Sequence, residues 1–284
     1  MIIDIHTHTF PEKIAAKTVE RLQSFSHTKP FTDGTVDALR ASMARSGVDR
    51  SVVMPVATNA HQVSHVNDAS IALNDRGAET GVLSFGCMHP DCPDWRAELG
   101  RIAAAGLRGI KLHPVYQDVD FDDPRYLRIL DRSAEVGLIV LIHAGRDVGY
   151  PGADRVSPRT IRSAWTQCDG GTLICAHMGG WHEWEEAERL LPELGVYIDT
   201  AFSLGTMTPN GDGYYRFPEE LSLLNEERFV QMVHTFGAER VLFGTDSPWG
   251  EQAADLAALR AVPLTPEERE AILGGNAARL LRIH

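Results

Sequence analysis

The sequence is poor in cysteine and has no concentrated positive charge, and both shortages narrow its possible functions. Its four cysteines, Cys87, Cys92, Cys168 and Cys175, form no Cys-x-x-Cys pair, so we predict neither a zinc knuckle nor a disulfide framework. We expect reduced thiols in a cytoplasmic protein. The net charge is −12 and no basic run is present, which disfavours nucleic acid and anionic membranes as partners.

Long apolar stretches are also missing. No run approaches the roughly 18 residues of a membrane span, and the N-terminus has neither the basic nor the apolar part of a signal peptide. We therefore expect no membrane segment, and no targeting segment before the first strand. With 284 residues, 43% of them hydrophobic, the chain is long enough for two small domains or for one large α/β barrel.

The sequence does contain a regular succession of short apolar segments. They are rich in β-branched residues and do not alternate with polar ones, which is typical of parallel strands buried on both faces. Eight such segments occur, at residues 1–6, 51–56, 81–88, 109–113, 137–143, 171–177, 195–200 and 240–246.

Helical patterns separate many of these segments. Several have Pro near the start or Gly at the end, and Thr265 with Glu268 forms a capping box. They occur at 35–48, 94–106, 124–137, 184–195, 224–237 and, as two helices, 265–283.

This alternation predicts an α/β fold, a (β/α)8 TIM barrel forming one domain over residues 1–284. A doubly wound open sheet is the alternative, which the absence of a Gly-x-Gly-x-x-Gly motif disfavours. Residues 144–165 and 201–223 are rich in Gly, Pro and polar residues, and we expect them to be long loops that shape the site.

Polar residues gather where the predicted strands end. In "MIIDIHTH", His6 and His8 are two residues apart, so on a strand their side chains point to one face. The ends of later strands carry Lys111, His113, His143, His177, Asp199 and Asp246. These strand ends form the active site of a barrel. Three imidazoles and a carboxylate, from His6, His8, His143 and Asp246, suit Zn²⁺, with Mn²⁺ or Fe²⁺ as alternatives.

These motifs resemble the amidohydrolase superfamily, and within it the amidohydrolase 2 branch. That branch includes aminocarboxymuconate-semialdehyde decarboxylase, γ-resorcylate decarboxylase and pyrone-dicarboxylate lactonase. The resemblance implies metal ligation by His6, His8, His143 and Asp246, and substrate polarisation or proton transfer by His177. It rests on "DIHTHTFP" (4–11), "GIKLHPVYQ" (109–117), "LIVLIHAG" (138–145), "LICAHMGG" (173–180), "VYIDTA" (196–201), "VLFGTDSPW" (241–249) and "GGNAARLL" (274–281).

The role of Lys111 stays open between two interpretations. Binuclear amidohydrolases bridge two metals with a carbamylated lysine on this strand, whereas a lysine here could instead bind a substrate carboxylate. We favour the second interpretation and one metal per chain. His113 shares the strand face of Lys111, and we predict that it contacts substrate or, alternatively, donates a hydrogen bond behind a metal ligand. We also predict that Arg146 and Trp249 contact substrate.

The expected function is hydrolysis of a small amide, ester or lactone. Asp246 accepts a proton from a water that the metal activates, and His177 polarises the carbonyl. The alternative is a non-oxidative decarboxylase of a small carboxylated substrate, which would use the same ligands. A purely structural metal is disfavoured because such zinc sites are closed and rich in cysteine. The family is often dimeric, so a homodimer is a further expectation.

Overall fold

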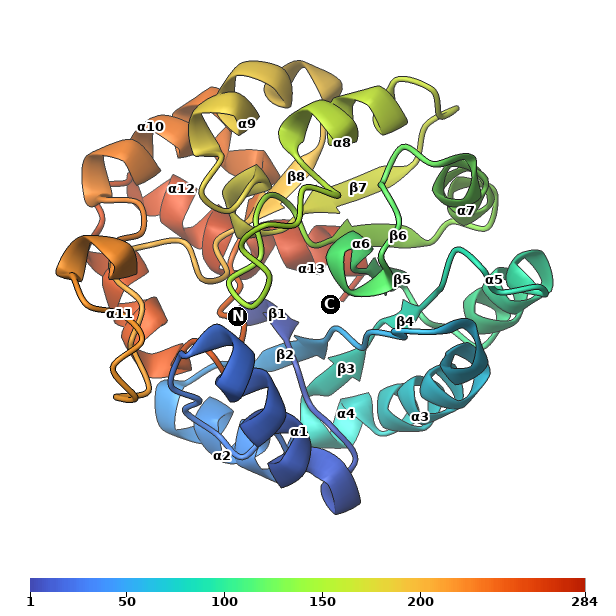
Figure 1. Cartoon of the computed structure of the whole chain (residues 1–284), viewed down its shortest axis with the longest axis horizontal. Helices are drawn as coiled ribbons and strands as arrows, with labels where there is room; N and C mark the ends of the chain where they lie inside the picture. The colour runs from blue at the N-terminus through green and yellow to red at the C-terminus, as the bar shows by residue number, and fades with distance from the viewer. Residues whose placement is uncertain (284) are drawn as a thin grey trace. The chain divides into compact units, whose positions relative to one another are not determined.

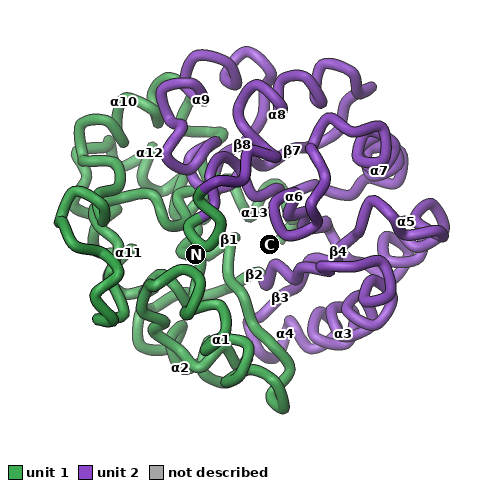
Figure 2. Tube along the Cα trace, viewed as in Figure 1, with its two compact units in different colours: residues 1–52, 148–151, 199–284 green, residues 53–147, 152–198 purple. Residues whose placement is uncertain are grey.

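A computed structural model describes residues 1–283, in which helices and strands alternate along the chain (Figure 1). The chain divides into two compact units (Figure 2): unit 1 comprises residues 1–52, 148–151 and 199–284, and unit 2 comprises residues 53–147 and 152–198. The single domain expected over residues 1–284 stays a prediction, and its last residue lies outside the described part. None of the described helices is both long and apolar enough to cross a membrane.

Every strand expected from the sequence is confirmed. Two of the observed strands, β3 and β4, belong to one expected segment, which is interrupted at Phe85. The strands are β1 (Ile3–Thr7), β2 (Arg50–Val53), β3 (Val82–Ser84), β4 (Gly86–Cys87), β5 (Gly109–Leu112), β6 (Ile139–Ile142), β7 (Thr172–Cys175), β8 (Tyr197–Asp199) and β9 (Val241–Leu242).

The strands of unit 2 pair in parallel. β5 pairs with β4 on one side and with β6 on the other, and β7 continues the sheet from β6. All four residues of β5 and of β6 are buried, which explains the uninterrupted apolar character of β6; β5 carries one residue of a charged type, Lys111. The residues that follow these strands therefore leave the sheet at the same edge.

In unit 1, β1 lies beside the segment that starts with β9. The amide of Ile5 donates to the carbonyl of Phe243 at 2.9 Å, and Thr7 forms a parallel bridge with Ser247. All five residues of β1 are buried. The end of β1 and residues 246–247 are thereby held together along the backbone.

The expected helices are present, and the structure adds others. Their bounds are α1 (Glu12–Ser26), α2 (Val36–Ser46), α3 (Val63–Asp75), α4 (Gly77–Thr80), α5 (Trp95–Ala104), α6 (Pro114–Gln117), α7 (Pro124–Glu135), α8 (Pro158–Trp165), α9 (Trp184–Leu190), α10 (Glu226–Phe236), α11 (Gln252–Ala261), α12 (Pro266–Glu270) and α13 (Asn276–Leu281). The capping box of Thr265 and Glu268 is confirmed.

One of the two expected loops is partly helical. Helix α8 occupies the end of residues 144–165, so the expectation of a continuous loop there was wrong. Ser157 caps this helix by accepting a hydrogen bond from the amide of Thr160 at 3.4 Å, and Pro158 occupies its first turn. Both are start signals of a helix. Residues 201–223 contain only isolated bridges and a 3-10 turn at Pro218–Leu221.

Candidate metal centre

Unit 1 brings together two of the predicted histidines and two aspartates, which we call the unit-1 cluster: His6, His8, Asp199 and Asp246. The backbone places them: the amide of Asp246 donates to the carbonyl of His6 at 2.8 Å, and the amide of His8 donates to the carbonyl of Ser247 at 2.6 Å. Asp246 has a φ of 62°, a strained conformation for a residue other than glycine. Such strain, held by surrounding bonds, is common at functional sites.

One carboxylate oxygen faces both imidazoles. Oδ1 of Asp246 lies 3.5 Å from Nε2 of His6 and 3.0 Å from Nε2 of His8. Ligand atoms that are each about 2.0–2.2 Å from one tetrahedral ion lie roughly 3.3–3.5 Å apart. The spacing of these three side chains therefore fits a shared divalent cation.

The second aspartate orients a histidine. Oδ2 of Asp199 lies 2.9 Å from Nδ1 of His6, and both side chains are fully buried. A carboxylate at this position accepts the Nδ1 proton, so Nε2 of His6 keeps its lone pair towards Asp246. This is the support that a metal-ligating histidine usually has.

Asp4 lies in β1, the same strand as His6, and its buried side chain stabilises the strand through hydrogen bonds. Its carboxylate accepts hydrogen bonds from the hydroxyl of Thr245 at 2.6 Å and the side-chain amide of Gln252 at 2.8 Å. Burial raises the pKa of Asp4 to about 7, and these hydrogen bonds limit the rise. No motif in the sequence pointed to a role for Asp4. A lone acid inside an apolar strand was the available signal.

Unit 2 gathers the other predicted histidines with one aspartate, the unit-2 cluster: His113, His143, Asp147 and His177. All four are buried. Nδ1 of His143 lies 3.1 Å from Nε2 of His177, and the rings of His143 and His113 stack with centroids 4.3 Å apart. Each histidine lies one or two residues beyond the end of its strand, so parallel pairing of β5, β6 and β7 brings them together.

Backbone bonds between two loops fix this arrangement. The amide of Trp181 donates to the carbonyl of Ala144 at 2.8 Å, and the amide of Arg146 donates to the carbonyl of Trp181 at 3.0 Å. Gly145, at a φ of 82°, leaves no room for a Cβ against Trp181. These contacts hold the residues after His143 against those after His177.

Asp147 is a member that the sequence analysis missed. Its Oδ2 lies 3.6 Å from Nε2 of His113 and 3.8 Å from Nε2 of His143. The nearer partner of His143 Nε2 is the carbonyl oxygen of Arg146 at 3.0 Å. The sequence signal was a carboxylate four residues after a strand-end histidine, in "HAGRD".

The remaining predicted residues have distinct surroundings. Lys111 lies in β5 and is buried, with 1% of its surface exposed. The side chain of Arg146 is 58% exposed and lies 3.7 Å from Glu183. Trp249 is half-buried and lines a pocket that contains no member of the unit-1 cluster. Their roles as substrate contacts stay predictions.

Comparison with known proteins covers nearly the whole chain. The amidohydrolase 2 family model, described as amidohydrolase, matches residues 3–283. No curated protein matches the sequence.

Three solved structures illustrate the similarity of fold. An uncharacterized TIM-barrel protein from Bordetella bronchiseptica has a TM-score of 0.73 at 18% identity, covering 99% of this chain and 98% of its own. The 5-carboxyvanillate decarboxylase LigW from Sphingomonas paucimobilis scores 0.67 at 16% identity, covering 100% and 99%. A probable 2-pyrone-4,6-dicarboxylic acid hydrolase from Acinetobacter baumannii scores 0.65 at 16% identity, covering 99% of each. The (β/α)8 barrel predicted from the sequence is thus confirmed as the fold class.

Proposed function

Because the chain belongs to the amidohydrolase family, we propose that it is a metal-dependent hydrolase of a small amide, ester or lactone. The observation that carries this proposal is the position of Asp246 Oδ1, facing Nε2 of both His6 and His8. Asp246 and His8 remain partly exposed, at 14% and 17% of their side chains. A ligand set with an exposed side can admit water and substrate, as catalytic sites require.

The ligands proposed within unit 1 are His6, His8 and Asp246. The resemblance to the family adds His143 as a further ligand, and this stays a prediction of the sequence. Nitrogen and carboxylate donors favour Zn²⁺, with Mn²⁺ or Fe²⁺ as alternatives, and we propose one ion per chain. A bound ion of this kind polarises a carbonyl oxygen and lowers the pKa of a coordinated water.

The protein side chains then hold and move protons. The carboxylate of Asp246 is the base that takes a proton from the attacking water. His177 polarises the substrate carbonyl or returns a proton to the leaving group, at the Nε2 atom that faces His143. Buried Lys111 and the stacked ring of His113 orient the substrate, and Arg146 and Trp249 are the proposed outer contacts.

Decarboxylation of a small carboxylated substrate is the second candidate. The position of Lys111, buried within β5, favours it, because a lysine side chain at this place can bind a substrate carboxylate. In this reaction His177 would protonate the carbon that loses carbon dioxide.

One assay separates the two reactions. The metal-loaded protein is incubated with small lactones, esters and amides and with carboxylated aromatic compounds, while acid release and carbon dioxide release are recorded together. Hydrolysis gives acid without carbon dioxide, whereas decarboxylation gives carbon dioxide. If the Asp246→Asn variant were as active as the wild type, this result would contradict the proposal. The matched control is His61→Asn, an exposed histidine outside both clusters.

A small-molecule substrate is the partner that this proposal requires. Homodimer formation and a cytoplasmic location complete the proposal. Sedimentation analysis tests the first, and fractionation of the source cells tests the second.

A further inference from the structure

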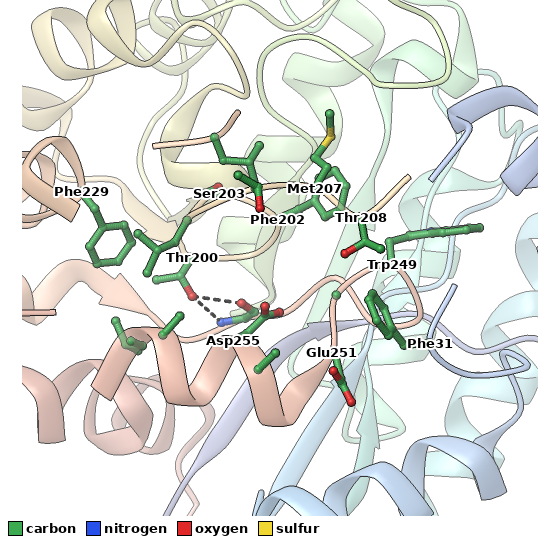
Figure 3. Close-up of a pocket in the computed structure, with 18 residues that line it drawn as sticks. Phe31, Thr200, Phe202, Ser203, Met207, Thr208, Phe229, Trp249, Glu251 and Asp255 are labelled. Atoms are coloured by element: carbon green, nitrogen blue, oxygen red, sulfur yellow. Dashed lines mark hydrogen bonds between the residues drawn. The ribbon is translucent and has the colours of Figure 1, made fainter. Parts of the chain in front are cut away.

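Unit 1 contains a pocket of about 110 Å³ that none of the proposed metal ligands or proton-transfer residues lines (Figure 3). Helices α10 and α11 contribute to its wall, together with residues from the segment 200–208. None of the four residues of the unit-1 cluster lines it. A cavity of this size takes an apolar group of about four to six carbon atoms.

A carboxylate without a hydrogen-bond donor opens into this pocket. Asp255 lines it from helix α11, and among residues 1–283 no group donates a hydrogen bond to its side chain. The carboxylate lies against the backbone of Gly250, where a Cβ would meet Oδ2 at 2.5 Å. A partly buried acceptor in this state gains from any donor that enters the pocket.

The charged groups that shift the pKa of Asp255 are carboxylates. Burial, with the nearby carboxylates of Asp4, Asp246 and Glu251, raises the pKa of Asp255 well above its usual value. Glu251 lines the pocket itself. An entering cation would relieve this repulsion, whereas an entering anion would add to it.

Aromatic rings stand on both sides of the carboxylate. Figure 3 shows Asp255 between Phe229 on one side and Phe31 with Trp249 on the other. Nζ of Lys29 lies 5.2 Å from the ring centroid of Phe31, so this ring already accepts a cation. Aromatic faces and aliphatic residues such as Ala258 and Leu259 suit a ligand with an apolar body and a positive charge.

We infer that this pocket binds a small organic ammonium ion, with its charged group at Asp255 and its apolar body between the aromatic rings. The inference does not rest on the proposed hydrolysis, because no proposed metal ligand lines the pocket. Trp249, a proposed outer contact of the substrate, is shared by the two proposals.

The pocket nevertheless lies close to the proposed metal ligand His6, with the backbone at Gly244 between them. Its lining includes Thr200 and Gly244, and the hydroxyl of Thr200 donates to the carbonyl of Gly244 at 3.0 Å. A Cβ on Gly244 would lie 2.9 Å from the Cβ of His6. A ligand in the pocket would therefore rest against the backbone segment that supports His6.

Three probes with the same apolar body test the inference: the butylammonium ion, 1-butanol and butyrate. Their dissociation constants are measured by calorimetry or ligand-detected NMR on the metal-loaded protein. We expect butylammonium to bind at least tenfold more tightly than 1-butanol, and butyrate not to bind. Equal affinities for butylammonium and 1-butanol, or tighter binding of butyrate, would overturn the inference.

Two variants locate the binding, with thermal unfolding showing that each is folded. Asp255→Asn should reduce butylammonium affinity to that of 1-butanol, and Ala258→Phe should abolish binding of both by filling the pocket. Glu267→Gln removes one exposed charge outside the pocket and should change nothing. Unchanged butylammonium binding in Asp255→Asn, or an equal loss in Glu267→Gln, would refute the assignment. Binding that persists after chelation separates this result from the fate of the proposed metal centre.

Discussion

The unit-1 and unit-2 clusters both gather histidines and aspartate, but they are built differently. In unit 1 one histidine lies in β1 and the other directly follows this strand, and two carboxylates lie 2.9–3.5 Å from their nitrogens. In unit 2 the three histidines follow three strands and contact one another, and Asp147 lies 3.6–3.8 Å away. Charged ligands favour a cation, whereas paired imidazoles favour proton transfer and orientation. The spacing of both groups would allow a metal ion, and because the carboxylates lie closer to the imidazoles in unit 1, we propose metal binding chiefly there and proton transfer in unit 2.

The largest effect should come from Asp246→Asn. The variant loses a charged ligand and the proposed base together, so we expect turnover to fall by about 10⁴-fold, the upper range for loss of a proton-transfer group, and metal affinity to fall as well. Steady-state rates and metal titration measure the two effects. Near-normal turnover in this variant would contradict the different roles proposed for the unit-1 and unit-2 clusters.

His177→Asn tests the proton-transfer side of the comparison. We expect turnover to fall by about 10³-fold while the metal content stays at the wild-type level. Elemental analysis and kinetics on the same preparation separate these outcomes. Loss of the metal in this variant would show that His177 helps to hold the metal, against our assignment of this residue to proton transfer.

Substitution of the two supporting aspartates compares the clusters directly. Asp199→Asn should weaken metal binding by about 10–100-fold, because it removes the hydrogen-bonded carboxylate behind His6. Asp147→Asn should weaken it less than about tenfold, since the nearest partner of His143 Nε2 is a backbone carbonyl. Competition with a chelator measures both. The reverse order would contradict the assignment.

The smallest predicted effect concerns stability in unit 2, away from its histidines. Hydrogen bonds from Arg101, and from Asn67, lower the pKa of Glu98. Its contribution to stability is therefore present above the unfolded-state pKa and is lost as the pH falls through the lowered value. Between pH 5 and 3, Glu98→Gln should lose less unfolding free energy than the wild type, by under about 1 kcal/mol. Urea titrations at each pH measure this, and an identical acid loss in both proteins would contradict it.

The features that could be predicted from the sequence are those that depend on residues close together in the chain. Strands appeared as apolar segments, and His6 with His8 was visible because a strand repeats every two residues. Helix α8 was missed because Gly and Pro recur in the residues before it, although Ser157 and Pro158 marked its start. Asp147 was missed because its partner His113 is far away in sequence and becomes a neighbour only through strand pairing.

The direction in which the side chains of the site point also could not be predicted from the sequence. The left-handed backbone of Asp246, which aims its carboxylate between two imidazoles, arises from hydrogen bonds to β1. No local residue pattern encodes that conformation, since an aspartate rarely adopts a positive φ without tertiary support. Asp4 and Asp255 likewise acquire their properties through burial that only the folded chain creates.

Metal content per chain tests the central claim most directly. The wild type, the His6→Ala/His8→Ala variant and the control His61→Ala/His65→Ala, whose residues are exposed, are purified without added metal and analysed for bound elements. We predict about one equivalent of zinc, manganese or iron in the wild type and the control, and loss of that metal in the His6/His8 variant. A wild-type protein that takes up no metal even after reconstitution, or a His6/His8 variant that keeps it, would contradict the account.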